Sequence, residues 1–242
     1  MRILVTGGAG YLGSEVARQA VAAGHDVLAT KLVHEPPHGR PLLLDLRQPF
    51  DLGDVDVVIH TAYVQADPDM IVRSTANVVE AARRAGARVI HLSTDLVFDG
   101  EGGAPYSEED EPRPVSAYGR AKLEAERLVD GLIVRTSLLY GKPESGPQER
   151  LAAEGAEFYV DEIRCPTRVG ELAAALLELA VSDERGVLHV AGPDAVSRLE
   201  FALRLGAVDP RGVPTPPGRA RNVALDSKRA GSLLKTGLTG IA

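Results

Sequence analysis

Short apolar runs and longer helix-patterned stretches alternate along the chain. The run RILVT at 2–6 is typical of a strand, and SEVARQAVAAGH at 14–25 then repeats apolar residues at helical spacing up to Gly24. Several runs are apolar throughout, as in strands that are buried on both faces of a sheet. The pattern predicts strands at 2–6, 26–30, 41–46, 55–62, 87–94, 131–141, 157–162 and 186–192. It predicts helices at 14–25, 75–86, 116–129, 168–181 and 197–206, and one that begins at Ser227.

This alternation predicts an α/β fold with a doubly wound parallel sheet. The regular order of elements ends at Gly141, and KPESGPQER at 142–150 has the composition of a loop. We therefore expect a first domain at 1–141 and a smaller lobe at 142–242, some elements of which return to the sheet of the first domain.

Composition and charge narrow the classes of partner. Of the 242 residues, 44% are hydrophobic and 25% are charged, which is ordinary for a globular protein. The formal net charge of -7 disfavours nucleic acids and anionic membranes as partners. Cys165 is the only cysteine, so no intrachain disulfide can form and a buried structural role is expected for it. The six histidines lack metal-ligand spacing, and no signal-peptide or membrane-length run occurs, so we expect no metal site and a cytoplasmic location.

The segment TGGAGYLG places Gly7, Gly10 and Gly13 directly between the first strand and the first helix. A glycine-rich turn in this context is typical of dinucleotide binding. Gly7 permits the tight turn, Gly10 lets the backbone approach a pyrophosphate, and Gly13 lets the helix pack closely on the sheet. The helix N-terminus adds positive potential for the anion. An ordinary turn between a strand and a helix is the alternative interpretation.

The end of the second strand bears on the choice of dinucleotide. Folds that bind NAD usually have an acidic residue there for the ribose hydroxyls, whereas this chain has Thr30 and Lys31. A 2′-phosphate would be tolerated at such a position, so NADP, used as NADPH, is the predicted cofactor and NAD is the alternative. A solvated Lys31 without a ligand also stays open. Asp45 and Leu46 follow the third strand and are expected to line the adenine.

Tyr118 and Lys122 stand four positions apart at the start of a predicted helix, on one face of it. At about 5 Å and an effective dielectric of about 20, the lysine charge is worth about 3 kcal/mol to a phenolate, or roughly two pKa units. The pair is therefore a candidate for acid–base chemistry, or else an ordinary surface pair. Ser93 and Thr94 end the strand at 87–94, where a hydroxyl could bind a substrate carbonyl oxygen or simply cap the strand.

Together these motifs resemble the extended short-chain dehydrogenase/reductase superfamily and, within it, the dTDP-4-dehydrorhamnose reductase family. The resemblance rests on TGGAGYLG, STDLVFDG, PVSAYGRAKLEAE, IVRTSLLYG, CPTRVGELA, GVLHVAG and NVALDSKRA, in that order along nearly the whole chain. It implies hydride transfer from a reduced nicotinamide to the C4 ketone of a nucleotide-linked sugar. It also implies that Tyr118 donates the proton, that Thr94 holds the oxygen, and that Lys122 lowers the tyrosine pKa and contacts the nicotinamide ribose. The cofactor contacts that it implies are Gly7, Gly10, Tyr11, Leu12, Gly13, Lys31, Asp45, Leu46, Thr61, Ala62, Tyr63, Tyr118 and Lys122.

The chain departs from the family pattern on the substrate side. Ile71, or Arg73 in a shifted register, stands where the family usually has an asparagine. Leu138 stands where the family commonly has a tryptophan, and Arg164 stands where it typically has a small glycine. The segment HTAYVQADPDM at 60–70 is shorter than its counterpart, and the C-terminal tail is short. We therefore expect an intact cofactor site and a reduced lobe for the nucleotide-linked sugar.

The leading hypothesis is an NADP-preferring reductase of a 4-keto sugar nucleotide. Two alternatives stay open: a sugar-nucleotide epimerase or dehydratase that uses the same three residues, and a non-catalytic regulatory subunit that binds the dinucleotide. Arg219 and Arg221 are interpreted either as contacts to a substrate diphosphate or as plain surface arginines. The acidic run SEEDE at 107–111 is interpreted as a solvated loop.

Overall fold

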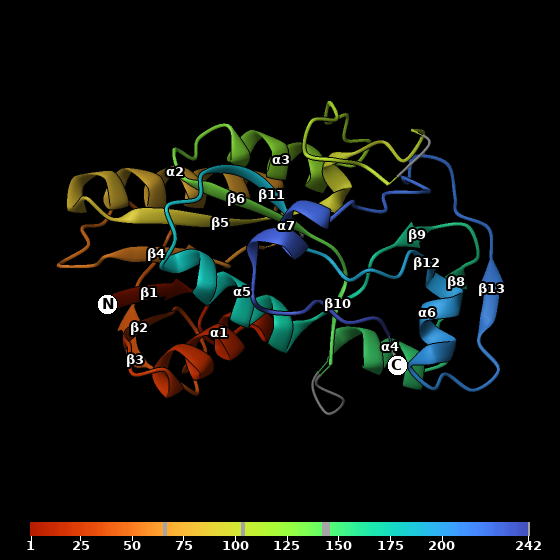
Figure 1. Ribbon diagram of the computed structural model, residues 1–242, viewed down its shortest axis with the longest axis horizontal. Coiled ribbons are helices and arrows are strands. Elements are labelled where there is room, and N and C mark those ends of the chain that lie inside the picture. Colours follow the sequence, from red (N-terminus) through yellow and green to blue (C-terminus); the bar gives the residue numbers. More distant parts are fainter. Residues whose placement is uncertain (65–66, 103–104, 142–145, 242) are drawn as a thin grey trace. The chain divides into compact units, whose positions relative to one another are not determined.

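A computed structural model describes residues 1–64, 67–102, 105–141 and 146–241 (Figure 1). Its main feature is a seven-stranded sheet with the strand order β3-β2-β1-β4-β5-β6-β11. The pairs β1–β2, β1–β4, β2–β3 and β4–β5 are all parallel. The predicted doubly wound α/β fold is therefore confirmed, and the strand order reverses direction between β1 and β4. The strands are β1 (Arg2–Thr6), β2 (Asp26–Lys31), β3 (Arg40–Leu43), β4 (Val57–His60), β5 (Arg88–Thr94), β6 (Leu132–Thr136) and β11 (Gly186–His189).

Helices connect these strands, and Figure 1 shows α1 and α2 on opposite sides of the sheet. The predicted C-terminal glycines are confirmed, since Gly24 (φ 82°) and Gly86 (φ 68°) take the left-handed conformation beyond α1 and α2. Helix α2 begins earlier than predicted, because Asp67 accepts a hydrogen bond from the Met70 N–H at 3.2 Å and Pro68 occupies the first turn. The four helices are α1 (Tyr11–Ala22), α2 (Pro68–Ala85), α3 (Ala117–Glu126) and α5 (Val169–Ala180).

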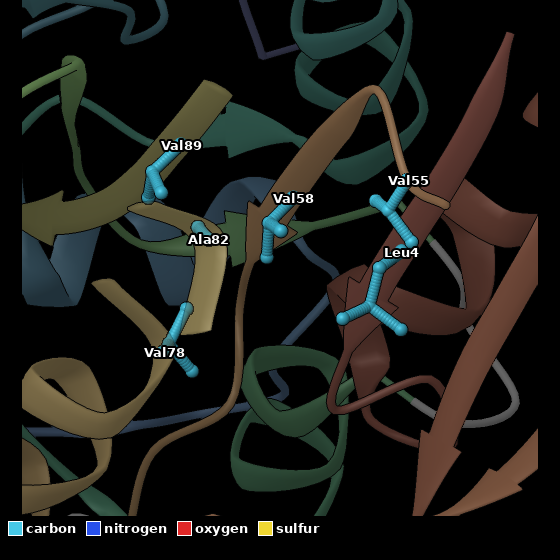
Figure 2. Packing of buried hydrophobic residues seen from close by; sticks show 6 residues of the cluster. All are labelled: Leu4, Val55, Val58, Val78, Ala82 and Val89. Carbon is cyan, nitrogen blue, oxygen red and sulfur yellow. The ribbon is translucent and has the colours of Figure 1, made fainter. Parts of the chain in front are cut away.

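Branched apolar side chains fill the space between the central strands and α2. Figure 2 shows this cluster, in which side chains of β1, β4 and β5 meet side chains of α2. These strands are rich in apolar and β-branched residues because both of their faces are covered. The labelled cluster consists of Leu4, Val55, Val58, Val78, Ala82 and Val89.

The third strand differs from its prediction. The run at 41–46 is apolar throughout and was predicted to be buried, but β3 ends at Leu43, and Leu43 is 69% exposed. The reason is topological, because β3 lies at the edge of the sheet and pairs only with β2. Leu42 packs against the core cluster of Figure 2, so only one face of this strand is covered.

The C-terminal part of the chain contains short elements. The predicted strand at 131–141 is divided into β6 and β7, and the predicted loop at 142–150 is wrong from Pro147 onwards, where α4 begins after Gly146. Proline at the first helical position favours this start. Residues 142–145 of that loop lie outside the described residues. The remaining elements are η1 (Asp95–Val97), β7 (Leu139–Tyr140), α4 (Pro147–Ala153), β8 (Glu157–Tyr159), β9 (Ile163–Arg164), β10 (Thr167–Arg168), β12 (Val196–Ser197), α6 (Arg198–Arg204), β13 (Arg211–Val213) and α7 (Lys228–Leu233).

The chain forms two compact units that interleave in sequence. Unit 1 consists of Met1–Ser93, Ala121–Val134 and Ala173–Val187, and unit 2 consists of Thr94–Arg120, Arg135–Leu172 and Leu188–Ala242. The division expected from the sequence has one boundary after residue 141, whereas the chain passes between the units after residues 93, 120, 134, 172 and 187. In the part of the chain that the structure describes, no helix combines the length and hydrophobicity needed to cross a membrane.

Candidate functional site

A cavity of about 370 Å³ lies in unit 1, beside the turn that joins β1 to α1. Seven of the residues predicted to contact a cofactor line it: Gly7, Gly10, Lys31, Asp45, Leu46, Ala62 and Tyr63. Tyr11, Leu12, Gly13, Thr61 and Lys122 also belong to unit 1 but are not part of the lining. The cavity therefore brings together residues from the ends of β1, β2, β3 and β4, at the point where the strand order of the sheet reverses.

The glycines of the turn leave room for a ligand that approaches the backbone. Gly7 has a φ of 70°, which a residue with a side chain adopts only at a cost. A Cβ atom on Gly13 would lie 2.2 Å from the Gly7 carbonyl oxygen and 2.8 Å from Thr61 Oγ1, so α1 packs tightly against the turn. A Cβ atom on Gly10 would meet only the Gly7 carbonyl oxygen, at 3.1 Å, and Gly10 itself lines the cavity. A side chain at Gly10 would therefore extend into the cavity.

The N-terminus of α1 is suited to an anion. Gly10 caps the helix without a side-chain hydrogen bond, and the first turn contains no acidic residue. The N-terminal N–H groups of a helix and its dipole favour negative charge at this end. A pyrophosphate thus fits the chemistry of the turn, and the residues of the cavity fit a dinucleotide.

The charged residues at the far end of the cavity are more numerous than the sequence reasoning supposed. Lys31 forms an ion pair with Glu35, a partner that the sequence analysis did not anticipate for it. The Arg47 side chain donates to Asp45 from Nε, at 2.8 Å to Oδ1 and 2.9 Å to Oδ2, and from Nη2 at 2.7 Å to Oδ2, and the Arg47 backbone N–H donates to Oδ1 at 3.0 Å. These bonds lower the pKa of Asp45 below its usual value, so this carboxylate is ionised.

Arg47 and His34 also line the cavity, and the sequence analysis missed both. Arg47 stands only two residues after Asp45, which had been singled out, so its position in that loop was a usable signal. His34 lies in the proline-rich loop after β2. A loop has no repeating pattern of hydrophobic residues, so the sequence does not indicate which way this side chain points.

Lys122 of α3 is almost entirely buried in unit 1. Its side chain is 4% exposed, and Nζ donates a hydrogen bond to the Leu92 carbonyl oxygen at 2.7 Å. Burial lowers the pKa of Lys122 to about 8, while the nearby charge of Glu126 acts in the opposite direction. Glu126 is itself buried and accepts a hydrogen bond from Ser93 Oγ. Adjacent residues of β5 thus anchor both members of this pair.

Two buried histidines share the surroundings of Lys122. His60 of β4 and His91 of β5 are register partners with ring centroids 5.3 Å apart. His60 is hydrogen-bonded to Thr6 Oγ1 at 2.7 Å and to Thr75 Oγ1 at 3.2 Å, whereas neither ring nitrogen of His91 has a partner among the described residues. Burial and the Lys122 charge lower both pKa values, that of His60 to about 3. Both rings are therefore neutral, and the ammonium of Lys122 is the positive charge beside them.

Thr94 belongs to unit 2, where it caps the short helix η1. Its hydroxyl oxygen accepts a hydrogen bond from the Leu96 N–H at 3.2 Å, and its proton is donated to Asp95 Oδ1 at 3.1 Å. Asp95 is fully buried and forms an ion pair with Arg164. The capping role that the sequence analysis kept as an alternative is thus present, together with a charged neighbour that it did not anticipate.

Tyr118 is the second residue of α3 and is half-buried. It belongs to unit 2, whereas Lys122 belongs to unit 1, because the chain passes between the units after Arg120. The helical spacing of four positions is the feature that links the two residues. The joint action of Thr94, Tyr118 and Lys122 stays a prediction.

The residues that depart from the family pattern have structural roles of their own. Ile71 is buried in unit 1, where its carbonyl oxygen accepts hydrogen bonds from Ser74 Oγ at 3.2 Å and Thr75 Oγ1 at 2.8 Å. Leu138 packs against a small apolar cluster in unit 2 that includes Tyr140. Cys165 is 2% exposed and its burial raises the thiol pKa to about 11, so it has the buried structural environment that was expected. Within the described ranges, no group of three His, Cys, Asp or Glu residues could hold a metal ion.

Comparison with known proteins places the chain in a large set of relatives. The family model described as "RmlD substrate binding domain" matches residues 1–230. A dTDP-4-dehydrorhamnose reductase of Mycobacterium tuberculosis is 35% identical, with 94% of this chain and 86% of the relative covered. A solved structure described as a hypothetical dTDP-4-dehydrorhamnose reductase from Sulfolobus tokodaii is 28% identical, with a TM-score of 0.85 over 100% of this chain and 98% of that one. The structure of MoeE5 in complex with UDP-glucose and NAD is 27% identical, with a TM-score of 0.83 over 100% and 94% of the two chains.

Proposed function

Because the chain belongs to the RmlD substrate binding domain family, we propose that it is an NADP-preferring reductase of the 4-keto group of a nucleotide-linked sugar. The family membership confirms the resemblance carried by the motifs, and with it the class of enzyme, an NAD(P)-dependent short-chain dehydrogenase/reductase. The relative from Mycobacterium tuberculosis bears the name of such a reductase, which supports the choice of reaction.

The observation that carries the proposal is the cavity at the glycine turn. The Gly7 and Gly10 backbone would hold the pyrophosphate, the loop with Asp45 and Leu46 would hold the adenosine half, and Tyr63 would lie toward the nicotinamide half. When NADPH is bound, it supplies the hydride that reduces the ketone carbon. The work of the chain is to orient that cofactor and to provide the proton.

We assign the proton donor to Tyr118. The ketone oxygen takes the phenolic proton as the carbon takes the hydride, so the products are an alcohol and a phenolate. Lys122, protonated at neutral pH because its pKa is about 8, stabilises that phenolate and holds the cofactor ribose. Thr94 directs its hydroxyl at the same oxygen and stabilises the charge that develops on it.

The preference for NADP is assigned to the cations at the adenosine end of the cavity. Lys31 and Arg47 line it, and a 2′-phosphate there would exchange places with Glu35 on Lys31 or with Asp45 on Arg47. Exposed ion pairs are worth only about 0.2 to 1 kcal/mol, and here each new pair replaces an existing one. The preference for NADPH over NADH is therefore expected to be modest, about fivefold or less.

On the substrate side, the candidate for the nucleotide diphosphate is Arg198. Among the described residues its guanidinium has neither an ion pair nor a side-chain hydrogen bond, and burial lowers its pKa to about 10, with the Arg164 charge acting in the same direction. Arg219 and Arg221, the candidates from the sequence, already pair with Glu162 and Asp161. A half-buried cation whose hydrogen-bond donors are not already taken by a carboxylate is the stronger candidate for binding an anion.

The experiment is a panel of nucleotide-linked 4-keto sugars offered with NADPH, with oxidation of NADPH followed by absorbance and the product identified by NMR. We expect turnover of at least one member of the panel and, by calorimetry, tighter binding of NADPH than of NADH. Removal of the cations in Lys31→Ala and Arg47→Ala should reduce that preference, with Arg18→Ala, an exposed arginine of α1, as the control. Binding of NADPH without reduction of any sugar in the panel would refute the reductase and leave a dinucleotide-binding protein.

A further inference from the structure

The buried carboxylate of Asp95 accepts four hydrogen bonds from three side chains of unit 2. Oδ1 accepts hydrogen bonds from the Thr94 hydroxyl at 3.1 Å and from Arg164 Nη2. Oδ2 accepts from Arg164 Nε at 2.7 Å and from the Ser137 hydroxyl at 2.5 Å. Asp95 is 0% exposed, so bulk solvent does not reach these oxygens. Arg164 thus binds both oxygens of the group that holds the Thr94 proton.

This arrangement sets the direction of the Thr94 hydroxyl. A hydroxyl has one proton, and that of Thr94 is donated to Asp95, while its oxygen accepts the Leu96 N–H at 3.2 Å. To hold a substrate oxygen, the hydroxyl must turn its proton away from Asp95. A carboxylate without Arg164 would hold that proton more strongly, since its charge would no longer be balanced and no guanidinium would share Oδ1 with the Thr94 hydroxyl.

We propose that Arg164 is a positioning residue for the reduction, which acts on Thr94 through Asp95; the inference rests on the function proposed above. The Arg164 guanidinium balances the Asp95 charge and shares its oxygens, so the Thr94 hydroxyl is free to turn toward the ketone oxygen. It also shields that oxygen from a buried negative charge while negative charge develops on it.

The Arg164 guanidinium is also held by a second carboxylate, that of Glu162. Its Nη1 donates to Glu162 Oε1 at 3.3 Å, and Glu162 Oε2 accepts from Arg219 at 2.8 Å and 2.9 Å. Arg164 is 5% exposed and Glu162 is 1% exposed, so the hydrogen bond between them is formed away from solvent, whereas the Arg219 side chain is half-exposed. The guanidinium is therefore held between two carboxylates in one orientation, as a positioning role requires.

Two substitutions separate the effect of the positive charge of Arg164 from the effect of its planar guanidinium group. Arg164→Met removes both and should lower kcat about 10²-fold, the size of effect seen when one donor to a developing oxyanion is lost. Arg164→Lys keeps a positive charge without the planar fork and should have a smaller effect, about tenfold. The Kd of NADPH should be unchanged in both variants, because the cavity that is assigned to the cofactor is lined by unit 1.

The deciding experiment is a double-mutant cycle between Arg164 and Thr94. If Arg164 acts through the Thr94 hydroxyl, Arg164→Met and Arg164→Lys should cost little further kcat when Thr94→Val is already present. A purely structural role would lower kcat by the same factor in both backgrounds, and that result would overturn the inference. Arg204 of α6, which pairs with Asp194 and Glu200 in the same unit, provides the matched control as Arg204→Met and Arg204→Lys.

Folding and the proposed function are checked in the same series. Thermal melts identify variants that fail to fold, and the cycle with Arg164→Lys decides the question if Arg164→Met does not fold. If the wild type reduces a sugar but Thr94→Val reduces it equally fast, the role of Thr94 and the inference built on it are both refuted. If the wild type reduces no sugar, the proposed function fails and the inference fails with it. Additive costs in an active enzyme refute the inference alone.

Discussion

Glu126 lies one helical turn after Lys122 on α3, and its charge opposes the effect of burial on the lysine pKa. The substitution Glu126→Gln removes that charge with little change in shape, and an amide can still accept the hydrogen bond from Ser93. If Lys122 must be protonated for reduction, the enzyme should become sensitive to pH near neutrality. The change tests whether the buried ammonium is the working form of the residue.

The magnitude follows from the separation and the starting pKa. Residues four apart on a helix have Cβ atoms about 5 to 6 Å apart, and at an effective dielectric of about 20 the pair is worth about 3 kcal/mol, or about two pKa units. The Lys122 pKa of about 8 leaves about nine-tenths of the enzyme protonated at pH 7. A fall of two units would leave about one-tenth protonated, so kcat at pH 7 should decrease about tenfold and recover as the pH is lowered.

The assay is the pH profile of kcat for the wild type, for Glu126→Gln and for Glu124→Gln, whose side chain is exposed on the same helix. The alkaline limb should lie near pH 8 in the wild type and in the control, because the Lys122 pKa is about 8, and it should move to lower pH in Glu126→Gln. A limb that stays in place while kcat falls equally at every pH would show that Glu126 supports the fold and does not set the charge of Lys122.

Three further results are expected. Tyr118→Phe retains the ring but removes the acid, so kcat should fall about 10²- to 10⁴-fold with an unchanged NADPH Kd; turnover at the wild-type rate would exclude Tyr118 as the proton donor. Gly10→Val should abolish NADPH binding in calorimetry while the melting temperature stays near that of the wild type, because its side chain would extend into the cavity. Burial lowers the Lys122 pKa from 10.5 to about 8, so the unfolded chain binds more protons between these values and the wild type should gain stability as pH rises from 8 to 10.5. Lys122→Met lacks this gain and should melt above the wild type at pH 7, and equal melting temperatures there would contradict the burial cost.

The fold was predictable from the sequence to the extent that local signals determine it. Most apolar runs, the glycine turn and the terminal glycines of α1 and α2 depend on neighbours along the chain, and these matched the structure, although the runs at 41–46, 131–141 and 157–162 form shorter or divided strands. The exposure of β3 was not predictable, since an apolar strand at the edge of a sheet has the same sequence as one in the middle. Helix α4 was missed because proline and glycine at 146–147 indicate a loop as readily as a helix start.

For the candidate site, too, some features could be predicted from the sequence and others could not. The predicted residues that line the cavity lie at the ends of strands. The order of the strands in the sheet brings these ends together. The ion pairs were not predictable. Glu35 lies in a proline-rich loop and forms an ion pair with Lys31, and Arg164 is 69 positions from Asp95 in the sequence.

These unpredicted pairs determine how the predicted residues can act. Lys31 has to leave Glu35 before it can bind a 2′-phosphate, so its charge contributes the difference between two partners and not the strength of one pair. The hydroxyl of Thr94 likewise has to leave Asp95 before it can donate to a substrate oxygen. In both cases the functional group already has an ion-pair or hydrogen-bond partner in the free protein. The strength of that existing interaction determines how much free energy a ligand must supply to replace it. Under the proposed function, selectivity for the 2′-phosphate and for the ketone would therefore depend on Glu35 and Arg164 as well as on the residues that contact the ligands.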